Sequence, residues 1–169
     1  MINAIFAADM HGGLGLQGSL PWPNNSSDLQ HFKTLTTGGI VVMGRRTYDD
    51  PKMPKPLKDR TVYVVSNRMI NDSVHQIRGD IVSEILKLEQ ANPNQTVWVI
   101  GGADVLEQCE SIYDRIYLTH IKGSYKIDTK INLKGLLSGR LMRSASAAPK
   151  DNCTFVVYES IFRRTKTST

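Results

Sequence analysis

The sequence has few of the features that mark metal centres, disulfide frameworks or membrane segments. Its two cysteines, Cys109 and Cys153, are far apart and show no metal-ligand spacing. We therefore expect two buried thiols in a reducing compartment and no bound metal. The apolar runs, such as residues 40–43, are far too short to cross a bilayer. Residues 1–6 lack the basic region and the apolar length of a secretory signal, so we expect a cytoplasmic protein without membrane contact.

The positive charge of the chain is not distributed in a way that suits nucleic acid. The formal net charge is +5, but Arg163, Arg164 and Lys166 carry three of these charges in a final segment without acidic residues. The other 18 basic residues are balanced by 16 acidic ones. A duplex-binding surface needs a concentrated basic face, and none is visible outside this segment. We expect no nucleic-acid partner, and we expect residues 163–169 to form a frayed, solvated tail.

Length and pattern indicate a single α/β domain. A chain of 169 residues with 40% hydrophobic content can bury a full core without disulfides. Strands that alternate with helices predict a largely parallel sheet, and the last two strands, with no helix between them, predict an antiparallel edge. The expected domain covers residues 1–162, with a smaller lobe at about 39–95. Strands are predicted at 2–8, 40–43, 61–65, 97–100, 115–121 and 154–162, and helices at 26–37, from 44, at 80–91 and at 103–110.

One acidic residue lies on the apolar side of a short predicted helix. With helical periodicity, Asp28, Phe32 and Leu35 form a single stripe. A carboxylate that faces the same way as apolar side chains loses hydration, so its pKa should rise. Such a group suits a polar ligand or a proton transfer. The alternative is an ordinary acidic residue in the first turn or cap of a helix, and helix geometry alone favours that alternative.

A glycine-rich segment precedes this helix and matches a dinucleotide-binding pattern by its letters alone. Gly13, Gly15 and Gly18 fit G-x-G-x-x-G, but that fingerprint works only if the last glycine enters a helix. Pro21 and Pro23 follow and forbid one. We interpret the match as accidental and the segment as a mobile lid that excludes water from a site, with a plain surface loop as the alternative.

Three predicted strand ends carry groups that suit phosphate. Gly101-Gly102 ends one strand, and without Cβ atoms the backbone can approach an anion closely. Gly44-Arg45-Arg46-Thr47 adds two guanidinium groups, and Ser66-Asn67-Arg68 adds further donors. Ligands gather beyond the carboxyl ends of parallel strands. We therefore infer a phosphorylated cofactor with an additional phosphate group.

Two further residues have open interpretations. Arg60 could bind a substrate carboxylate through its forked donors, or it could be a solvated charge at a sheet edge. Thr119 lies within a predicted strand and could hydrogen-bond a buried group, although threonine is also a common strand former. His120 alternates with Thr119 and therefore faces the opposite side of the sheet, so we do not assign it a catalytic role.

Taken together, these segments resemble bacterial- and phage-type dihydrofolate reductases over nearly the whole chain. The resemblance rests on the following motifs, in this order: Leu20-Pro21-Trp22, Asp28-Leu29, Phe32-Lys33, Val42-Met43-Gly44-Arg45-x-Thr47, Pro56-Leu57-x-x-Arg60, Val99-Ile100-Gly101-Gly102 and Tyr117-Leu118-Thr119-His120-Ile121. It implies an eight-stranded, mostly parallel mixed sheet with an antiparallel C-terminal strand and about four helices. It also implies NADPH-dependent reduction of 7,8-dihydrofolate to tetrahydrofolate by a monomer that antifolates inhibit.

The resemblance also implies roles for individual residues. Asp28 would bind the pterin and promote protonation at N5, Thr119 would support it through water, and Trp22 would hold a water nearby. Arg60 would pair with the glutamate α-carboxylate. The residues close to the chemistry would be Asp28, Trp22, Thr119 and Leu20. Substrate contacts would come from Ile5, Ala7, Asp28, Leu29, Phe32, Leu57, Arg60, Ile100 and Thr119. Cofactor contacts would come from Ala7, Leu14, Gly15, Gly18, Ser19, Gly44, Arg45, Arg46, Thr47, Ser66, Asn67, Arg68, Ile100, Gly101, Gly102, Ala103, Asp104, Val105 and Leu106.

Some positions depart from the family pattern, and two alternatives stay open. Leu106 lies where many members carry a tyrosine beside the nicotinamide, whereas Asp128 matches an acid that hydrogen-bonds the lid. The resemblance further implies a cis peptide between Gly101 and Gly102. One alternative is a reductase of the same fold that acts on a pyrimidine of riboflavin synthesis, which would not explain Asp28 or Arg60. The other is a non-catalytic domain that binds nucleotide or nucleic acid.

Overall fold

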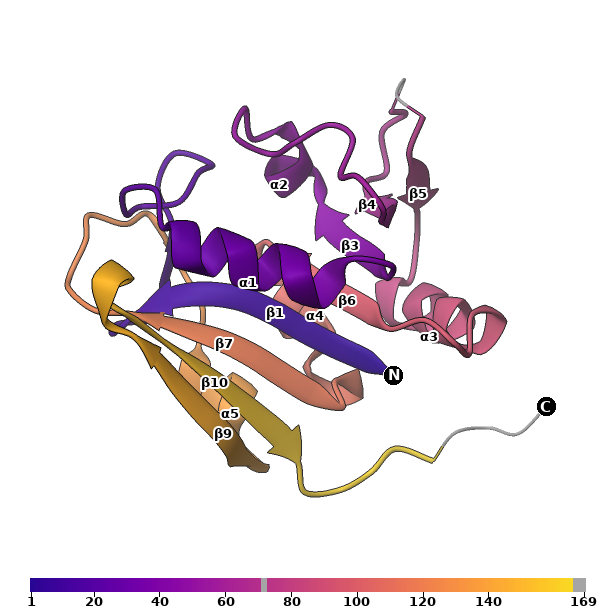
Figure 1. Cartoon of the computed structure of the whole chain (residues 1–169). Coiled ribbons are helices and arrows are strands. Elements are labelled where there is room, and N and C mark those ends of the chain that lie inside the picture. The colour runs from indigo at the N-terminus through magenta and orange to yellow at the C-terminus, as the bar shows by residue number, and fades with distance from the viewer. Residues whose placement is uncertain (71–72, 166–169) are drawn as a thin grey trace.

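The fold is built on one eight-stranded sheet, which Figure 1 shows with helices on both of its faces. The computed structural model describes residues 1–70 and 73–165. The strand order is β5-β4-β3-β6-β1-β7-β10-β9. The strands are β1 (Ile2–Asp9), β3 (Ile40–Gly44), β4 (Thr61–Val65), β5 (His75–Ile77), β6 (Val97–Gly101), β7 (Arg115–Ile121), β9 (Arg140–Ala148) and β10 (Cys153–Ser160).

The direction of pairing agrees with the expected sheet. From β5 to β7 all neighbouring strands are parallel, and β10 pairs antiparallel with both β7 and β9. A second, two-stranded sheet joins β2 (Gly13–Gly15) to β8 (Thr129–Lys130). The predicted α/β class and the antiparallel C-terminal strand are therefore confirmed.

Five α-helices and two 3₁₀ turns complete the fold. The helices are α1 (Ser26–Thr36), α2 (Arg45–Asp49), α3 (Ile81–Ala91), α4 (Ala103–Gln108) and α5 (Leu133–Leu137), and the turns are η1 (Glu110–Ile112) and η2 (Pro149–Asp151). Figure 1 shows α1 lying across one face of the sheet, over β1. No helix in the described part of the chain is long and apolar enough to cross a membrane.

The central strand β1 is buried along its whole length because both faces of the sheet are covered. Ile2, Ala4, Phe6 and Ala8 face the main core, which also takes side chains from α3, α4 and α5. Ala7 faces the other side, where it packs with Trp22. This double burial explains why the strand appears in the sequence as a continuous apolar run rather than an alternating one.

Several elements were missing from the sequence-based prediction. They are β2, β5, β8, α5 and β9, and most of them are short. β9 has nine residues but is exposed from Leu141 to Ala147, so it shows no buried alternation that a pattern search could detect. It forms because β10 offers it a pairing edge, with a bulge between Val157 and Tyr158.

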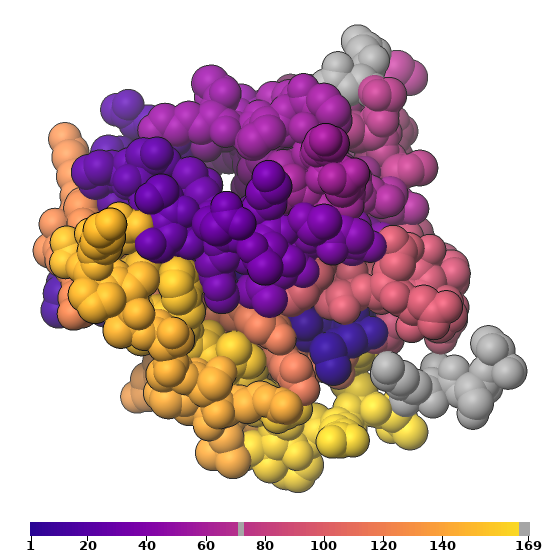
Figure 2. Space-filling view, in the orientation of Figure 1, coloured from indigo at the N-terminus to yellow at the C-terminus, as the bar shows by residue number. Residues whose placement is uncertain are grey.

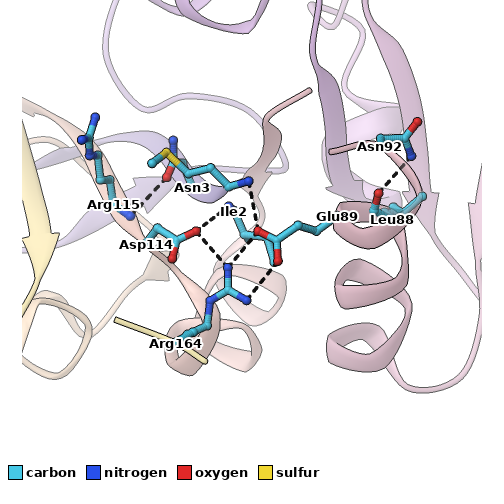
Figure 3. A network of polar contacts seen from close by, with 9 residues as sticks. Ile2, Asn3, Leu88, Glu89, Asn92, Asp114, Arg115 and Arg164 are labelled. Carbon is cyan, nitrogen blue, oxygen red and sulfur yellow. Dashed lines mark hydrogen bonds and ion pairs between the residues drawn. The ribbon is translucent and has the colours of Figure 1, made fainter. Parts of the chain in front are cut away.

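The end of the described chain is more firmly held than the sequence suggested. Arg164 donates to both oxygens of Glu89, at 3.2 and 3.0 Å, and to Asp114 Oδ2 at 2.8 Å. The amino group of Met1 lies 3.0 Å from Glu89 Oε2, and Ile2 N donates to Asp114 Oδ2 at 2.8 Å. Figure 3 shows this terminal network between α3 and the start of β7. The expected frayed tail therefore does not begin at Arg164, and residues 166–169 lie outside the described part of the chain.

Candidate active site

Asp28 lies in the first turn of α1, and it is not the residue that caps the helix. The cap is Asn25, whose side-chain oxygen accepts from Asp28 N at 3.0 Å. Asp28 is thus an acidic residue of the first turn, as helix geometry favoured, but it does not cap the helix. Because Asn25 takes over the capping role, the carboxylate of Asp28 is left for other interactions.

The carboxyl group of Asp28 is largely withdrawn from solvent and forms no ion pair with a basic side chain among the described residues. Burial raises the pKa of its carboxyl group, and a hydrogen bond with the side chain of Thr119 and the charge of His31 lower it less strongly. Thr119 comes from β7 and is 1% exposed. Thr119 thus lies close enough to Asp28 to affect its pKa, and its support of the acid through water stays a prediction.

Trp22 is buried on the same face of the sheet as Ala7 and has a hydrogen-bond donor that the described residues leave unused. Its side chain is 5% exposed and packs with Ala7, Ile121 and Cys153. The ring meets Tyr125 edge-on, with centroids 6.1 Å apart. Its Nε1 is buried and has no hydrogen-bond partner among the described residues. A buried, unpaired N–H is costly unless it binds a water or a ligand, which fits the predicted role of Trp22.

Apolar side chains line the predicted substrate region at different depths. Ile5, Ala7 and Leu57 are buried, and Phe32 and Ile100 are partly buried. Leu20 and Leu29 are 43% and 49% exposed, so they form an open apolar rim rather than part of the core. In Figure 2 the surface is hollowed between the α1 segment and the violet segment that follows β3.

Arg60 lies at the far end of α1 from Asp28. Its guanidinium carbon is 5.7 Å from the centre of the Phe32 ring, and Nη1 donates to Thr36 Oγ1 at 3.2 Å. Nε donates to Lys58 O at 3.0 Å. These acceptors are uncharged, and burial lowers the pKa of Arg60, although the charge of Asp59 partly opposes this. Arg60 is thus held in position while its charge is not used in an ion pair with α1.

The predicted phosphate-binding segments lie together where the parallel strands end, at the carboxyl-terminal side of the sheet. β3 and β6 are neighbours, and Met43 is paired with Gly101 at their carboxyl ends. A Cβ atom at Gly44 would lie 3.2 Å from Val105 Cγ2 and 3.5 Å from Gly102 N. Thr47 Oγ1 lies over both Gly101 and Gly102, which are joined by the predicted cis peptide. These glycines keep the junction narrow, and larger residues would fill it.

The two arginines that follow β3 differ in how far their guanidinium groups are already hydrogen-bonded. Arg45 Nε donates to both carboxylate oxygens of Asp49, at 3.2 and 3.0 Å, while its Nη1 is buried and has no partner among the described residues. Arg46 is exposed. An orphaned buried guanidinium donor beside a glycine cradle fits a phosphorylated cofactor.

The third strand end, after β4, is a closed turn. Ser66 Oγ donates to Arg68 O at 3.0 Å and accepts from Arg68 N at 3.2 Å. Gln76 donates to the carbonyl groups of both residues, which the sequence-based analysis did not anticipate. Asn67 and Arg68 remain exposed and free to face a ligand at this edge.

The predicted cofactor residues at the start of α4 differ in how far their side chains are exposed. Ala103 is partly buried and Asp104 is exposed at the start of α4. Val105 and Leu106 are 6% and 0% exposed and pack into the main core, so their side chains serve packing. Their contact with a cofactor stays a prediction.

Two carboxylates anchor the glycine-rich segment to the sheet. Asp128 Oδ2 accepts from Gln17 N at 2.7 Å, and this bond lowers the pKa of Asp128, as expected for an acid that holds lid amides. At the other end, Asp9 Oδ1 accepts from His11 N and Gly13 N at 2.9 and 2.8 Å. Asp9 was not predicted, although its place directly before the glycines is a usable signal.

The rest of this segment is held by packing and by local pairing. Leu14 packs against the main core and Gly15 pairs with Thr129. Leu16 and Ser19 form an isolated bridge across Gln17 and Gly18, both with positive φ. Ser19 Oγ is buried and has no partner among the described residues. The segment is thus an ordered turn, and its movement as a lid stays a prediction.

Comparison with known proteins agrees with this geometry. Residues 1–159 match the family model described as dihydrofolate reductase. The chain belongs to the dihydrofolate reductase family. It is 34% identical over 138 residues to dihydrofolate reductase type 8 of Escherichia coli, and this alignment covers 78% of this chain and 80% of the relative. It is 31% identical over 151 residues to the viral dihydrofolate reductase of Saimiriine herpesvirus 2 (strain 488), and this alignment covers 79% of this chain and 71% of the relative. It is 28% identical over 166 residues to the dihydrofolate reductase of Sus scrofa, and this alignment covers 89% of each chain.

Membership of this family of enzymes decides between the open alternatives. Dihydrofolate reductases are enzymes that use a nicotinamide cofactor and bind a small substrate and antifolate inhibitors. The match extends over both the acid-bearing helix α1 and the strand ends of β3 and β6. The non-catalytic alternative and the riboflavin-pathway alternative therefore lose their support.

Proposed function

We propose that this protein reduces 7,8-dihydrofolate to 5,6,7,8-tetrahydrofolate with NADPH, and that Asp28 promotes protonation of the substrate at N5. The observation that carries the proposal is the state of Asp28. It is an acid withdrawn from water, with its pKa raised by burial and with Thr119 rather than a cation as its partner. Such a carboxyl group keeps its proton to higher pH than an exposed aspartate and can also accept hydrogen bonds from a heterocycle.

The substrate would lie along α1 between two charged groups. Asp28 would bind the amino-pyrimidine end, and Arg60 would pair with the α-carboxylate of the glutamate at the other end. The apolar wall between them is supplied by Phe32 and Leu57. Because Arg60 now donates only to neutral oxygens, a carboxylate could replace these weaker bonds with a charge-assisted pair.

Water control is the second contribution of the protein. Trp22, with its unpaired Nε1, would hold a single water close to Asp28. Leu20 and Leu29 would cover the bound substrate from the rim, and the anchored segment from Gly13 to Gly18 would close over it. A dry site strengthens the electrostatic contacts of Asp28 and prevents side reactions.

The carboxyl ends of β3, β4 and β6 would bind NADPH. When bound, this cofactor supplies the hydride that reaches C6 of the substrate. Gly101 and Gly102 would admit its pyrophosphate, and Thr47 would lie against it. Arg45, Arg46 and the turn at Ser66 would face the additional 2′-phosphate, which favours NADPH over NADH. We further propose that the protein acts as a cytoplasmic monomer without a nucleic-acid partner.

A direct assay tests the reaction. Purified protein is mixed with dihydrofolate and either NADPH or NADH, and nicotinamide absorbance is followed. We expect rapid oxidation of NADPH, slower oxidation of NADH at equal concentration, and tetrahydrofolate as the product. No dihydrofolate-dependent oxidation of either cofactor would reject the proposed function.

Replacement of Asp28 tests its assigned role. Asp28→Asn should reduce turnover at pH 7 by roughly two orders of magnitude or more, the typical contribution of a general acid. NADPH affinity should be nearly unchanged, and the loss should shrink at low pH, where the substrate is protonated beforehand. Glu159→Gln is a matched control, because this carboxylate pairs with Arg143 on the distant strand β9. Equal turnover of Asp28→Asn and the parent protein would remove Asp28 from the mechanism.

A further inference from the structure

His31 is a titratable side chain close to Asp28 that the mechanism above does not use. It follows Asp28 by three positions on α1, so the two side chains lie on the same side of the helix. The imidazole ring is stacked on Phe155 of β10, with centroids 4.1 Å apart and an angle of 20° between the planes. This stacking holds the ring against β10, where Phe155 is paired with Thr119 of β7.

The other groups around His31 carry no competing charge. His31 lines a shallow hollow together with Phe155 of β10, Ala148 of β9, and Ser26, Ser27, Gln30 and Thr34 of α1. All six are uncharged. An acid on a neighbouring element, Asp151 of η2, accepts from Ser27 N of this helix at 2.8 Å. Lys150, beside it, acts on the charge of Asp151.

The groups that face Asp28 can be named in the same way. Thr119 reaches it from β7, and Cys153 from β10 is a buried thiol whose pKa is raised by burial and by the charges of Asp28 and Asp151. Neither the hydroxyl group nor the thiol carries a charge near neutral pH. Within the described residues, His31 is thus the group whose own charge acts on Asp28.

We propose that His31 is a positioning residue that acts through Asp28 and sets the pH range in which Asp28 holds the proton needed by the substrate. The inference rests on the proposed function. The two side chains compete for one proton: a proton on His31 places a positive charge beside Asp28 and favours its carboxylate form, whereas a neutral His31 lets Asp28 stay protonated at higher pH.

The direction of the individual shifts supports this competition. Burial lowers the pKa of His31, and the negative charge of Asp28 raises it. Burial raises the pKa of Asp28, and His31 lowers it. A protonated His31 therefore opposes protonation of Asp28, whereas a neutral His31 does not. As the pH falls, His31 gains charge and limits further protonation of Asp28.

Two substitutions with opposite charge separate this role from a purely structural one. His31→Gln keeps a polar side chain without a charge, so the midpoint of the turnover–pH profile should move to higher pH. His31→Arg keeps a permanent charge, so the midpoint should move to lower pH. At pH 7 we expect turnover to differ between the two variants by about two- to fivefold, the scale of charge coupling between neighbouring positions on a partly buried helix face.

His120 offers a matched control. It is also half-buried, burial also lowers its pKa, and its Nε2 lies 3.0 Å from the Tyr158 hydroxyl group. It alternates with Thr119 on β7 and so faces away from Asp28. His120→Gln should leave the midpoint of the profile unchanged. Midpoints that move in the same direction for His31→Gln and His31→Arg, or that do not move at all, would overturn the proposal.

A second readout does not depend on catalysis. Carbon-13 NMR of the aspartate carboxyl groups, with Asp28→Asn to assign the signal, follows the protonation of Asp28 directly. The titration of Asp28 should move to higher pH in His31→Gln even if turnover has another origin. A shifted titration with unchanged turnover profiles would reject Asp28 as the acid, whereas an unshifted titration would reject the role of His31. If His31→Arg fails to fold, the NMR titration of His31→Gln decides the question alone.

Discussion

Asp28 and Glu89 lie at the ends of two helices of equal length, and both are withdrawn from water, yet their surroundings differ in charge. Asp28 is in the first turn of α1 and Glu89 in the last turn of α3, each with 11 residues. Burial raises the pKa of both acids. At Glu89 the hydrogen bonds and charges of Arg164 and the Met1 amino group outweigh burial, so its pKa falls below the ordinary value. At Asp28 burial wins.

The basic residues show the same contrast. Burial lowers the pKa of both Arg60 and Arg164. Arg164 is bonded to two carboxylates, Glu89 and Asp114, and its pKa is raised overall. Arg60 donates to neutral oxygens, and its pKa stays lowered. The terminal network thus pairs every charge that it buries, whereas the site leaves one acid and one base without an ionic partner.

This contrast distinguishes charges that hold the fold from charges kept for a ligand. A buried charged group that is paired with an opposite charge is of little use for ligand binding, because its hydrogen bonds are already made within the protein. A buried charge with neutral partners is costly to the folded state, and such groups concentrate at functional sites. Asp28 and Arg60 have this second character, and they flank the apolar wall that would take the substrate.

Removal of Arg60 should show the largest effect on ligand binding. Arg60→Ala should weaken dihydrofolate binding by about 1.5–3 kcal/mol, as expected for a hydrogen bond to a charged group. Fluorescence titration checks this, and a pteridine without the glutamate should bind the variant and the parent equally. Lys55→Ala is the control, because this lysine lies over the Tyr48 ring, 4.7 Å from its centre. Unchanged affinity in Arg60→Ala would place the carboxylate elsewhere, with Lys55 as the first candidate.

Disruption of the paired acid should affect stability and leave chemistry unchanged. Glu89→Gln should lower the free energy of unfolding at pH 7 by about 1–3 kcal/mol, because Arg164 then keeps a single carboxylate partner. Since the folded-state pKa of Glu89 is lowered, its contribution is present above the unfolded value and is lost as the pH falls through the folded value. The deficit should therefore shrink in acid, as measured by urea unfolding.

The control for this change is an exposed acid on the same helix. Glu84 pairs with Lys87 at 3.0 Å on the surface of α3. Glu84→Gln should change the free energy of unfolding by less than about 0.5 kcal/mol. Turnover should be unchanged in both variants. Equal effects of Glu89→Gln and Glu84→Gln would mean that the terminal network contributes no more than an ordinary surface pair.

The smallest effect should have the opposite sign. Asp28→Asn removes a charge that burial disfavours, so it should raise the free energy of unfolding at pH 7.5 by about 0.5–1 kcal/mol while it removes activity. Because the folded-state pKa of Asp28 is raised, the parent loses stability as the pH rises through that value. The gain in the variant should vanish at lower pH, where Asp28 is protonated. A destabilised variant at pH 7.5 would contradict the contrast between the two acids.

The sequence predicted most of the sheet because its strands are buried on both faces. Thr61–Val65 and Arg115–Ile121 were predicted with their observed bounds. The exposed edge strand β9 was missed, because its formation depends on β10 and not on its own pattern. Gln76 was missed for a related reason, since it acts by bonds to backbone carbonyl groups ten and eight residues away, which no side-chain pattern reports.

The sequence by itself determined that one acid shares a helix face with apolar residues, and that glycines and arginines follow buried strands. These are local properties, which periodicity and residue chemistry express directly. Only the tertiary structure decided that Thr119 becomes a neighbour of Asp28, that Phe155 stacks on His31, and that Arg164 neutralises Glu89. A pKa and a charge pair depend on distance and burial in three dimensions, and these are set when segments far apart in the chain pack together.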